Sequence, residues 1–432
     1  MQLNELSAST ARKMIAERKV SIAEYVEDHI ERVKARQSLV GAFEFFDEEF
    51  VRRQVRGLPD DVSAGALKGL PIAFKDIIDT RDMPTGYGSP IYANYRPGLD
   101  ACVVASTRAA QGLLFGKAVS TEFASPVPSP KTRNPIDPSR TPGGSSSGSA
   151  AAVADFQVPL AIGTQTVASV IRPASYCGVY GYKPTWGDIN YGGVKFSSPT
   201  LDTIGLFART VDDLALFRSV LAEIPFFGVW TRLLPRPRIG VCRTDFWSSC
   251  DAEMQNKFED IVQQLGEAGA QLQDMDMPRP FEQVPMLARW IGNREGALAL
   301  APERFDHHDL IGPELISDRV VDGVAVSYEC YRRAMETLDR CRLVLDDIFD
   351  DIDVILTPAV TGAAPAGLES TGNPVFGGLW TGLHVPCVSI PGWKTTSGLP
   401  LAVQFVARRG NDLKLLHIAK WIEAVVVAAK PK

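Results

Sequence analysis

Arg140-Thr-Pro-Gly-Gly-Ser-Ser-Ser-Gly-Ser-Ala150 is the stretch of sequence that decides the fold, and it runs directly into the apolar segment Ala151-Ala-Val-Ala154. Its early glycines and proline predict a tight turn that delivers the serines to the N-terminus of an alanine-rich helix. Such an N-terminus offers free backbone N–H groups and favours negative charge. Gly/Ser clusters are also typical of flexible linkers, but a linker seldom passes straight into an apolar helix, so we predict an ordered loop. No Gly-Lys-Ser or Gly-Lys-Thr closes it, which excludes a phosphate-binding P-loop.

Two further segments contain candidate reactive groups. Ala161-Ile-Gly-Thr-Gln-Thr-Val-Ala-Ser-Val-Ile-Arg-Pro-Ala-Ser175 is rich in hydroxyls, although such runs after a strand are usually turn and cap residues. Upstream, Lys75 interrupts the apolar run Gly69-Leu-Pro-Ile-Ala-Phe-Lys75-Asp-Ile-Ile. Burial there would lower the pKa of the lysine, and a neutral amine can act as a general base. The alternatives are that Lys75 extends to the surface or pairs with Asp76. Together with the serines, it indicates a serine nucleophile that is activated without histidine.

These motifs resemble the amidase signature family, serine hydrolases with a Ser-cisSer-Lys triad. The likeness continues through Cys177-Gly-Val-Tyr-Gly-Tyr-Lys-Pro-Thr185, Asp202-Thr-Ile-Gly-Leu-Phe-Ala-Arg-Thr-Val-Asp-Asp213, Val385-Pro-Cys-Val-Ser-Ile-Pro-Gly392 and Gly398-Leu-Pro-Leu-Ala-Val-Gln-Phe-Val-Ala407. Gln165 and the order Ser169-Val-Ile-Arg172-Pro resemble the malonamidase-like branch most closely. The resemblance implies that Ser169 is the acylated nucleophile, Ser145 the bridging serine on a cis peptide, and Lys75 the base.

The resemblance also implies an oxyanion hole made of the backbone N–H groups of Thr166, Val167, Ala168 and Ser169. Here the chain departs from the family, because Val167 and Ala168 replace a pair of glycines. A β-branched residue held at positive φ would be strained by about 1–3 kcal/mol. Either the loop does not need positive φ at these positions, or the site is altered; we expect the first.

Arg172 and Gln165 are the predicted substrate-binding residues. The Arg172 guanidinium would bind a substrate carboxylate or form a buried structural ion pair, and the sequence leaves both open. A bound carboxylate would favour short acid amides. An apolar pocket would instead favour anilides, aryl esters or carbamates. The middle region offers large apolar side chains for such a pocket, which are equally typical of ordinary core: Phe226, Phe227, Trp230, Leu287, Trp290 and Trp380.

We therefore predict an amidohydrolase that cleaves C–N bonds of small amides, with anilides, esters and carbamates (a urethanase activity) as further candidates. One alternative is the amidotransferase subunit of a glutamine-dependent, multi-subunit complex. Gln165 in place of the family's Asp, and the poorly matching region between Ile224 and Asp350, argue against it. The other alternative is a catalytically silent binding protein of the same fold. No metal or cofactor is expected, because the chemistry needs none and the His307-His308 pair has no metal-ligand spacing.

Short apolar strands alternate with amphipathic helices, which predicts a layered α/β fold with a large mixed, mainly parallel central sheet covered by helices. We expect a single domain over residues 1–432. Its expected parts are a helical N-terminus (1–65), a catalytic core (66–224), a variable, mostly helical pocket region (225–352) and C-terminal core strands with a helix (353–432). Expected elements are strands at 238–242, 354–358 and 401–406, and helices near 251–268 and from Asp412. Lys13 to Val33 predicts two helices, the second with a capping box of Ser21 and Glu24.

The composition predicts a protein of the reduced cytoplasm. The formal net charge is −6 and the basic clusters are short, so no nucleic-acid partner is expected. Seven scattered cysteines form neither a disulfide framework nor a metal pattern. No apolar run approaches the length of a membrane span, and the N-terminus lacks the core of a signal peptide. The expected partner is a small-molecule amide, ester or carbamate; the oligomeric state, a homodimer included, stays open.

Overall fold

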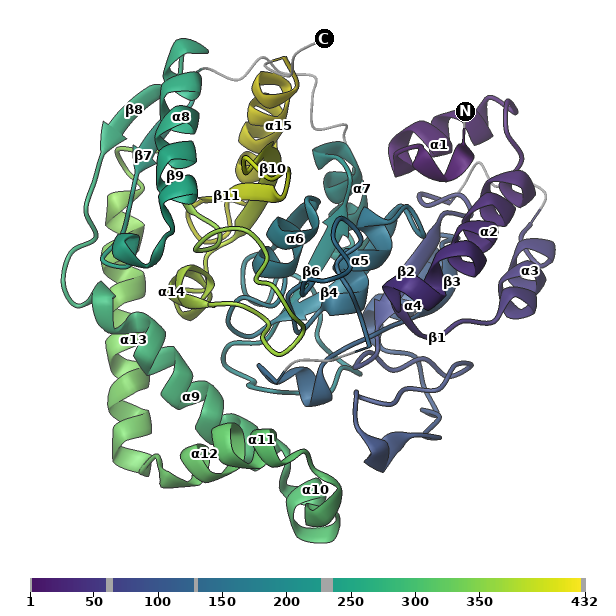
Figure 1. The fold of residues 1–432 in the computed structure, drawn as a ribbon, viewed down its shortest axis with the longest axis horizontal. Helices are drawn as coiled ribbons and strands as arrows, with labels where there is room; N and C mark the ends of the chain where they lie inside the picture. The colour runs from purple at the N-terminus through teal and green to yellow at the C-terminus, as the bar shows by residue number, and fades with distance from the viewer. Residues whose placement is uncertain (1, 60–64, 128–130, 227–235, 429–432) are drawn as a thin grey trace.

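The computed structural model describes residues 2–59, 65–127, 131–226 and 236–428. The strands are β1 (Phe43–Phe45), β2 (Pro71–Lys75), β3 (Leu113–Ala118), β4 (Leu160–Gln165), β5 (Tyr180–Lys183), β6 (Thr203–Ala208), β7 (Arg238–Val241), β8 (Gln271–Asp274), β9 (Val354–Pro358), β10 (Cys387–Lys394) and β11 (Pro400–Val406). In the described ranges they form one sheet in the order β1-β3-β2-β4-β6-β5-β10-β11-β9-β7-β8, covered by helices (Figure 1). The predicted layered α/β fold with a large mixed sheet is confirmed.

The pairing within this sheet is less parallel than we expected. Parallel pairs join β2 to β3 and β4, and β7 to β8 and β9. The other six of the ten described pairs are antiparallel. The expectation of a mainly parallel sheet was therefore wrong. Part of the reason is that β10 and β11 are joined by a tight turn closed between Thr395 N and Leu399 O at 2.9 Å, and such a hairpin forces antiparallel pairing.

The N-terminal helices follow their sequence signals. They are α1 (Ala8–Ala16), α2 (Ile22–Val40) and α3 (Glu48–Arg56). Both hydrogen bonds of the Ser21–Glu24 capping box are present at the start of α2. The two helices expected between Lys13 and Val33 are thus confirmed, although each extends beyond that range.

The catalytic part is covered by α4 (Cys102–Ala109), α5 (Ser147–Ala154), α6 (Ile171–Cys177) and α7 (Val211–Leu221), and the C-terminal part by α8 (Ala252–Glu267) and α15 (Asp412–Ala428). The strands expected at 238–242, 354–358 and 401–406 correspond to β7, β9 and β11. The helices expected near 251–268 and from Asp412 correspond to α8 and α15. None of the described helices is long and apolar enough to cross a lipid bilayer.

The middle of the chain forms a helical arm at one end of the molecule (Figure 1). The arm contains α9 (Val284–Ala299), α10 (Ala301–Asp306), α11 (Pro313–Leu315), a π-helical segment (Ile316–Val321), α12 (Asp322–Ala325) and α13 (Tyr328–Ile348). The same region also supplies β7 and β8 to the sheet, so it is not helical throughout. The helix α14 (Val375–Gly382) packs against α9 and brings the arm up to the carboxyl ends of β2 and β4.

Candidate active site

Parallel pairing of β2 with β4 brings the predicted site residues to one edge of the sheet. Lys75 is the last residue of β2, and Ser169 lies in the loop that follows β4. The carboxyl ends of parallel neighbours meet at the same edge, where α/β proteins commonly place their sites. Ser145 stands in the glycine–serine loop just before α5, which packs on β2 and β4.

Lys75 is fully buried and bound to two hydroxyls. Its Nζ lies 2.7 Å from Ser145 Oγ and 2.8 Å from Thr164 Oγ1. Burial lowers the pKa of Lys75 to about 7, although the nearby carboxylate of Asp202 favours the charged form. Both alternatives for this lysine were wrong, since Lys75 does not reach the surface and Asp76 pairs with Lys117 at 3.2 Å. Near neutral pH, a large fraction of Lys75 is therefore an uncharged amine.

Ser145 is the serine of its loop that meets the lysine. The Gly144–Ser145 peptide bond is cis, as the resemblance implied. The other serine hydroxyls of the loop donate to backbone carbonyls, at 3.1 Å from Ser146, 2.8 Å from Ser147 and 3.0 Å from Ser149. In the described ranges no hydrogen bond joins the Ser145 and Ser169 hydroxyls, so this structure contains only the Lys75–Ser145 half of the predicted relay.

The loop before Ser169 presents a row of unused donors. Within the described part of the chain, the backbone N–H groups of Thr166, Val167, Ala168 and Ser169 donate no hydrogen bond. Thr166, Val167 and Ser169 line a cavity of about 480 Å³. Unpaired amides beside a serine in a cavity are the geometry that an oxyanion hole requires.

Val167 and Ala168 fit this loop without a left-handed backbone. Neither is among the described non-glycine residues with positive φ, as we expected. Two glycines of α14 make room for their side chains. A Cβ on Gly377 would lie 2.5 Å from the Ala168 Cβ, and one on Gly378 would lie 3.2 Å from Val167 Cγ1. The side chains that replace the family's glycines therefore occupy space that glycines of α14 leave open.

Replacing Val167 by glycine tests the role of this loop. We expect Val167→Gly to change turnover by at least about threefold, because the added backbone freedom disturbs the donors, while stability changes by only about 1 kcal/mol. Steady-state kinetics and thermal melting of the variant measure the two effects. A large loss of stability with unchanged kinetics would contradict the oxyanion-loop role.

Gln165 lies behind the loop and brackets it. Its Oε1 accepts hydrogen bonds from the backbone N–H groups of Val170 (2.8 Å) and Ile171 (3.0 Å). Its Nε2 donates to Thr381 Oγ1 at 2.9 Å, and Thr381 donates to the Val167 carbonyl at 2.7 Å. Gln165 is fully buried and does not line the cavity, so the structure places it where it holds the loop rather than where it would touch substrate.

Arg172 does line the cavity. It is buried, and its Nη2 donates to the Gly144 carbonyl at 2.7 Å while Nη1 donates to the Gly372 carbonyl. No carboxylate of the described residues lies within ion-pair distance of Arg172, so the alternative of a buried ion pair was wrong. Its Nε has no partner within the described part of the chain. Burial lowers the pKa of Arg172 to about 10, which leaves it charged at neutral pH.

A second arginine, Arg319, lines the same cavity and was missed from the sequence. It lies in the π-helical segment, is buried, and donates from Nη1 to Ser197 Oγ at 2.6 Å. Its Nε is buried without a partner, and no described group pairs with its Nη2. Nε and Nη2 form the edge of a guanidinium that binds a carboxylate through two parallel hydrogen bonds. No motif surrounds Arg319, so the sequence offered no signal for it.

The predicted apolar pocket is not built from the expected aromatics. Leu287 and Trp380 are buried in a hydrophobic cluster, and neither lines the cavity. Phe226 and Trp290 are partly exposed elsewhere. Phe227 and Trp230 lie outside the described residues. Instead, the arm lines the cavity through small or polar residues and one methionine: Pro285, Met286, Ala288, Arg289, Gly292, Asn293, Asp318 and Arg319.

Comparison with known proteins agrees with this geometry. Residues 24–416 match the amidase family. The chain belongs to the amidase family. It is 31% identical over 472 aligned positions to a subunit of the glutamyl-tRNA(Gln) amidotransferase of Roseiflexus castenholzii, covering 96% of this chain and 95% of that one. Among solved structures, it is similar to an amidase (26% identity, TM-score 0.87, 97% and 99% covered). It is also similar to the corresponding subunit of the Thermotoga maritima glutamyl-tRNA(Gln) amidotransferase (26%, TM-score 0.80, 98% and 95% covered).

Proposed function

We propose that the chain cleaves the C–N bond of carboxylate-bearing amides through an acyl-enzyme on Ser169. Ser169 Oγ attacks the carbonyl carbon while its proton passes through Ser145 to the neutral amine of Lys75. The N–H groups of residues 166–169 bind the oxyanion. Collapse breaks the C–N bond, and Lys75 returns the proton through Ser145 to the leaving nitrogen. Water then hydrolyses the acyl-serine by the same route.

The observation that carries this proposal is the contact between Lys75 and Ser145. A fully buried lysine has its pKa lowered to about 7, and it lies 2.7 Å from a serine hydroxyl at the edge where Ser169 enters a cavity. An ordinary lysine, with a pKa near 10.4, would be almost entirely protonated at neutral pH and could not accept a proton. Here burial supplies the base that the reaction needs, with no histidine within the motif.

The charges around the cavity support the carboxylate in the substrate. Its charged lining residues are Arg172, Arg289, Arg319 and Asp318. Asp318 is already paired with Arg289 at 2.9 Å, which leaves the buried Arg172 and Arg319 without a carboxylate partner among the described residues. Two such guanidiniums with free N–H groups favour an anionic ligand over an anilide or an uncharged carbamate.

A specific observation favours a second candidate, the amide-cleaving component of a glutamine-dependent amidotransferase. The curated relatives are named as one of the subunits of such an enzyme and match nearly the whole chain. Glutamine is itself a carboxylate-bearing amide, so the same acyl-enzyme step would release its ammonia. The alignment spans 472 positions against 432 residues here, so that relative contains segments that this chain lacks. The difference between the candidates is the acceptor of the nitrogen and the need for partner subunits.

Ammonia release separates the two candidates. The purified chain would be given succinamate, glutamine, an anilide, an aryl ester and a carbamate. Efficient turnover of a short acid amide by the chain alone supports the hydrolase. Turnover that is confined to glutamine and requires a co-purifying partner supports the amidotransferase. Folded protein that releases nothing from any of them, and that does not co-purify with a partner, supports the silent binding protein.

Arg319→Gln tests the carboxylate selectivity. Succinamate and butyramide have similar size and differ in charge. We expect kcat/KM for succinamate to fall about 10- to 100-fold, because a charge-assisted hydrogen bond contributes about 1.5–3 kcal/mol, while butyramide turnover changes by less than about threefold. Ser197→Ala is the control, since it removes the structural partner of Arg319 and leaves the free edge. Equal losses for both amides would contradict an anion-binding role.

A further inference from the structure

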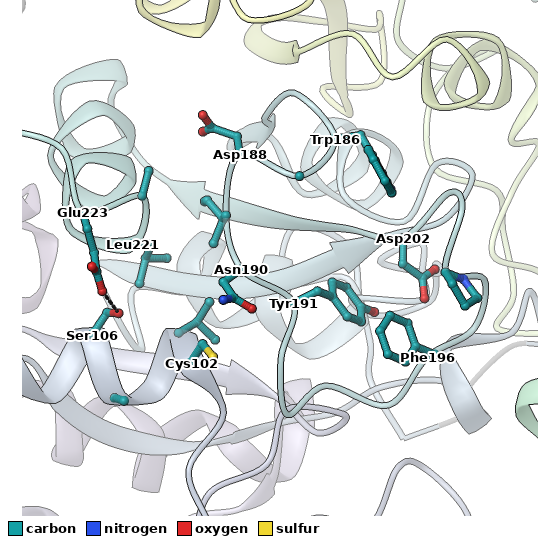
Figure 2. Close-up of a pocket in the computed structure, with 16 residues that line it drawn as sticks. Cys102, Ser106, Trp186, Asp188, Asn190, Tyr191, Phe196, Asp202, Leu221 and Glu223 are labelled. Atoms are coloured by element: carbon teal, nitrogen blue, oxygen red, sulfur yellow. Dashed lines mark hydrogen bonds between the residues drawn. The ribbon is translucent and has the colours of Figure 1, made fainter. Parts of the chain in front are cut away.

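A second pocket of about 720 Å³ lies next to the catalytic cavity, and Asp202 links the two. Asp202 lines the second pocket, and its carboxylate accepts a hydrogen bond of 2.6 Å from Thr166 of the oxyanion loop. Figure 2 shows the hydroxyl of Tyr191 pointing toward Asp202 in this pocket. Neither residue is explained by the acyl-transfer steps above.

A chain of hydroxyls runs from this pocket to Lys75. The Tyr191 hydroxyl interacts with both Asp202 and Thr164, and Thr164 Oγ1 lies 2.8 Å from Lys75 Nζ. The other contacts of Asp202 all come from donors, namely Thr166 Oγ1, Ser197 N at 2.7 Å and Ser198 N at 2.9 Å. Burial raises the pKa of the Asp202 carboxyl, and these donors oppose that rise because they favour the ionised form, which only accepts hydrogen bonds.

An accepting carboxylate at one end fixes the direction of every hydrogen bond in the chain. Tyr191 must donate to Asp202, so its oxygen is left to accept from Thr164. Thr164 then accepts from Lys75. A neutral lysine amine has two N–H groups and one lone pair. With an N–H group committed to Thr164, the lone pair is free to face Ser145, which is the orientation that accepts a proton.

We propose that Tyr191 is a positioning residue, which acts through Thr164 to turn the lone pair of Lys75 toward Ser145; this inference rests on the proposed function. Its hydroxyl does not line the catalytic cavity and touches no reacting atom. A purely structural role would belong to its ring, which stacks on Phe196 with the ring centres 5.0 Å apart. The hydroxyl and the ring can be removed separately, so the two roles can be told apart.

The test uses labelling of the full-length protein by a fluorophosphonate, with the maximal rate (kinact) and the half-saturating concentration (KI) measured separately. We expect Tyr191→Phe to lower kinact about tenfold, the loss of one hydrogen bond's worth of about 1–1.5 kcal/mol, and to leave KI unchanged. Phe196→Leu, which alters ring packing only, should stay within about twofold. Wild-type kinact in Tyr191→Phe would overturn the proposal, as would an equal loss in Phe196→Leu.

Thr164 provides a second arm that does not depend on Tyr191 alone. Thr164→Ser keeps the hydroxyl and should retain most of kinact, whereas Thr164→Val should lose at least as much as Tyr191→Phe. In the Thr164→Val background, Tyr191→Phe should have no further effect, because the two act in one chain. Additive losses, or equal rates for Thr164→Ser and Thr164→Val, would overturn the inference while leaving the proposed function in place. Absence of labelling in folded wild type would overturn both.

Discussion

Ser169→Ala is expected to lower kcat by about 10⁴- to 10⁶-fold, the loss seen when a serine hydrolase loses its nucleophile. The variant should fold and still bind substrate, because Ser169 Oγ makes no hydrogen bond within the described ranges that the fold would lose. Single-turnover measurements would show no acyl-enzyme. Calorimetric titration with succinamate, which the variant cannot turn over, measures the remaining binding.

The matched control is Ser175→Ala, a second buried serine on the same loop-and-helix segment. Its Oγ donates to the Ile171 carbonyl at 2.7 Å and meets Ser389 Oγ at 3.0 Å. This change should lower stability by about 1 kcal/mol while kcat stays within about threefold. If Ser169→Ala kept more than about a tenth of the activity, another residue would have to be the nucleophile.

Lys75→Met is the second large effect, with an expected loss of about 10²- to 10⁴-fold in kcat/KM. In the wild type the rate follows the neutral fraction of Lys75, because an ammonium cannot accept the proton of Ser145. Burial lowers the pKa of Lys75 to about 7. Activity should therefore fall tenfold per pH unit well below pH 7 and level off above it. In Lys75→Met this limb should be absent from the residual activity.

Lys117→Met is the control for burying a lysine in the same sheet. Lys117 is also fully buried, but its Nζ contacts Asp76 at 3.2 Å and Thr85 Oγ1 at 2.6 Å rather than a reactive serine. We expect its loss to lower the melting temperature, since Asp76 loses its partner, and to leave the acid limb near pH 7 in the folded fraction. An acid limb that persists in Lys75→Met but vanishes in Lys117→Met would reverse the assignment of the base.

The sequence located the site because its residues are carried by local motifs. Lys75 stands out in an apolar run, and Ser145 and Ser169 lie in short loops that join a strand to a helix. Parallel pairing of β2 and β4, two neighbours in a buried core, is enough to bring these motifs to one edge. The capping box of α2 was predictable for the same reason, since Ser21 and Glu24 are three residues apart.

The rest of the site depends on contacts between distant residues. Gln165 and Thr381 are 216 positions apart, and Arg319 meets Ser197 across 122. The fit of Ala168 against Gly377 depends on the docking of α14, which neither segment encodes alone. The aromatic pocket failed for a related reason. Hydrophobicity predicts that Trp380 is buried, but not whether it faces the cavity or the core.

The central claim is that Ser169 is an activated nucleophile, and intact-mass spectrometry after treatment with a fluorophosphonate tests it without knowledge of the substrate. The account predicts one adduct on the wild type and none on Ser169→Ala, with a labelling rate that rises as the pH passes about 7, where Lys75 loses its proton. Folded wild-type protein that stays unlabelled, or a Ser169→Ala variant that labels as fast, would contradict it.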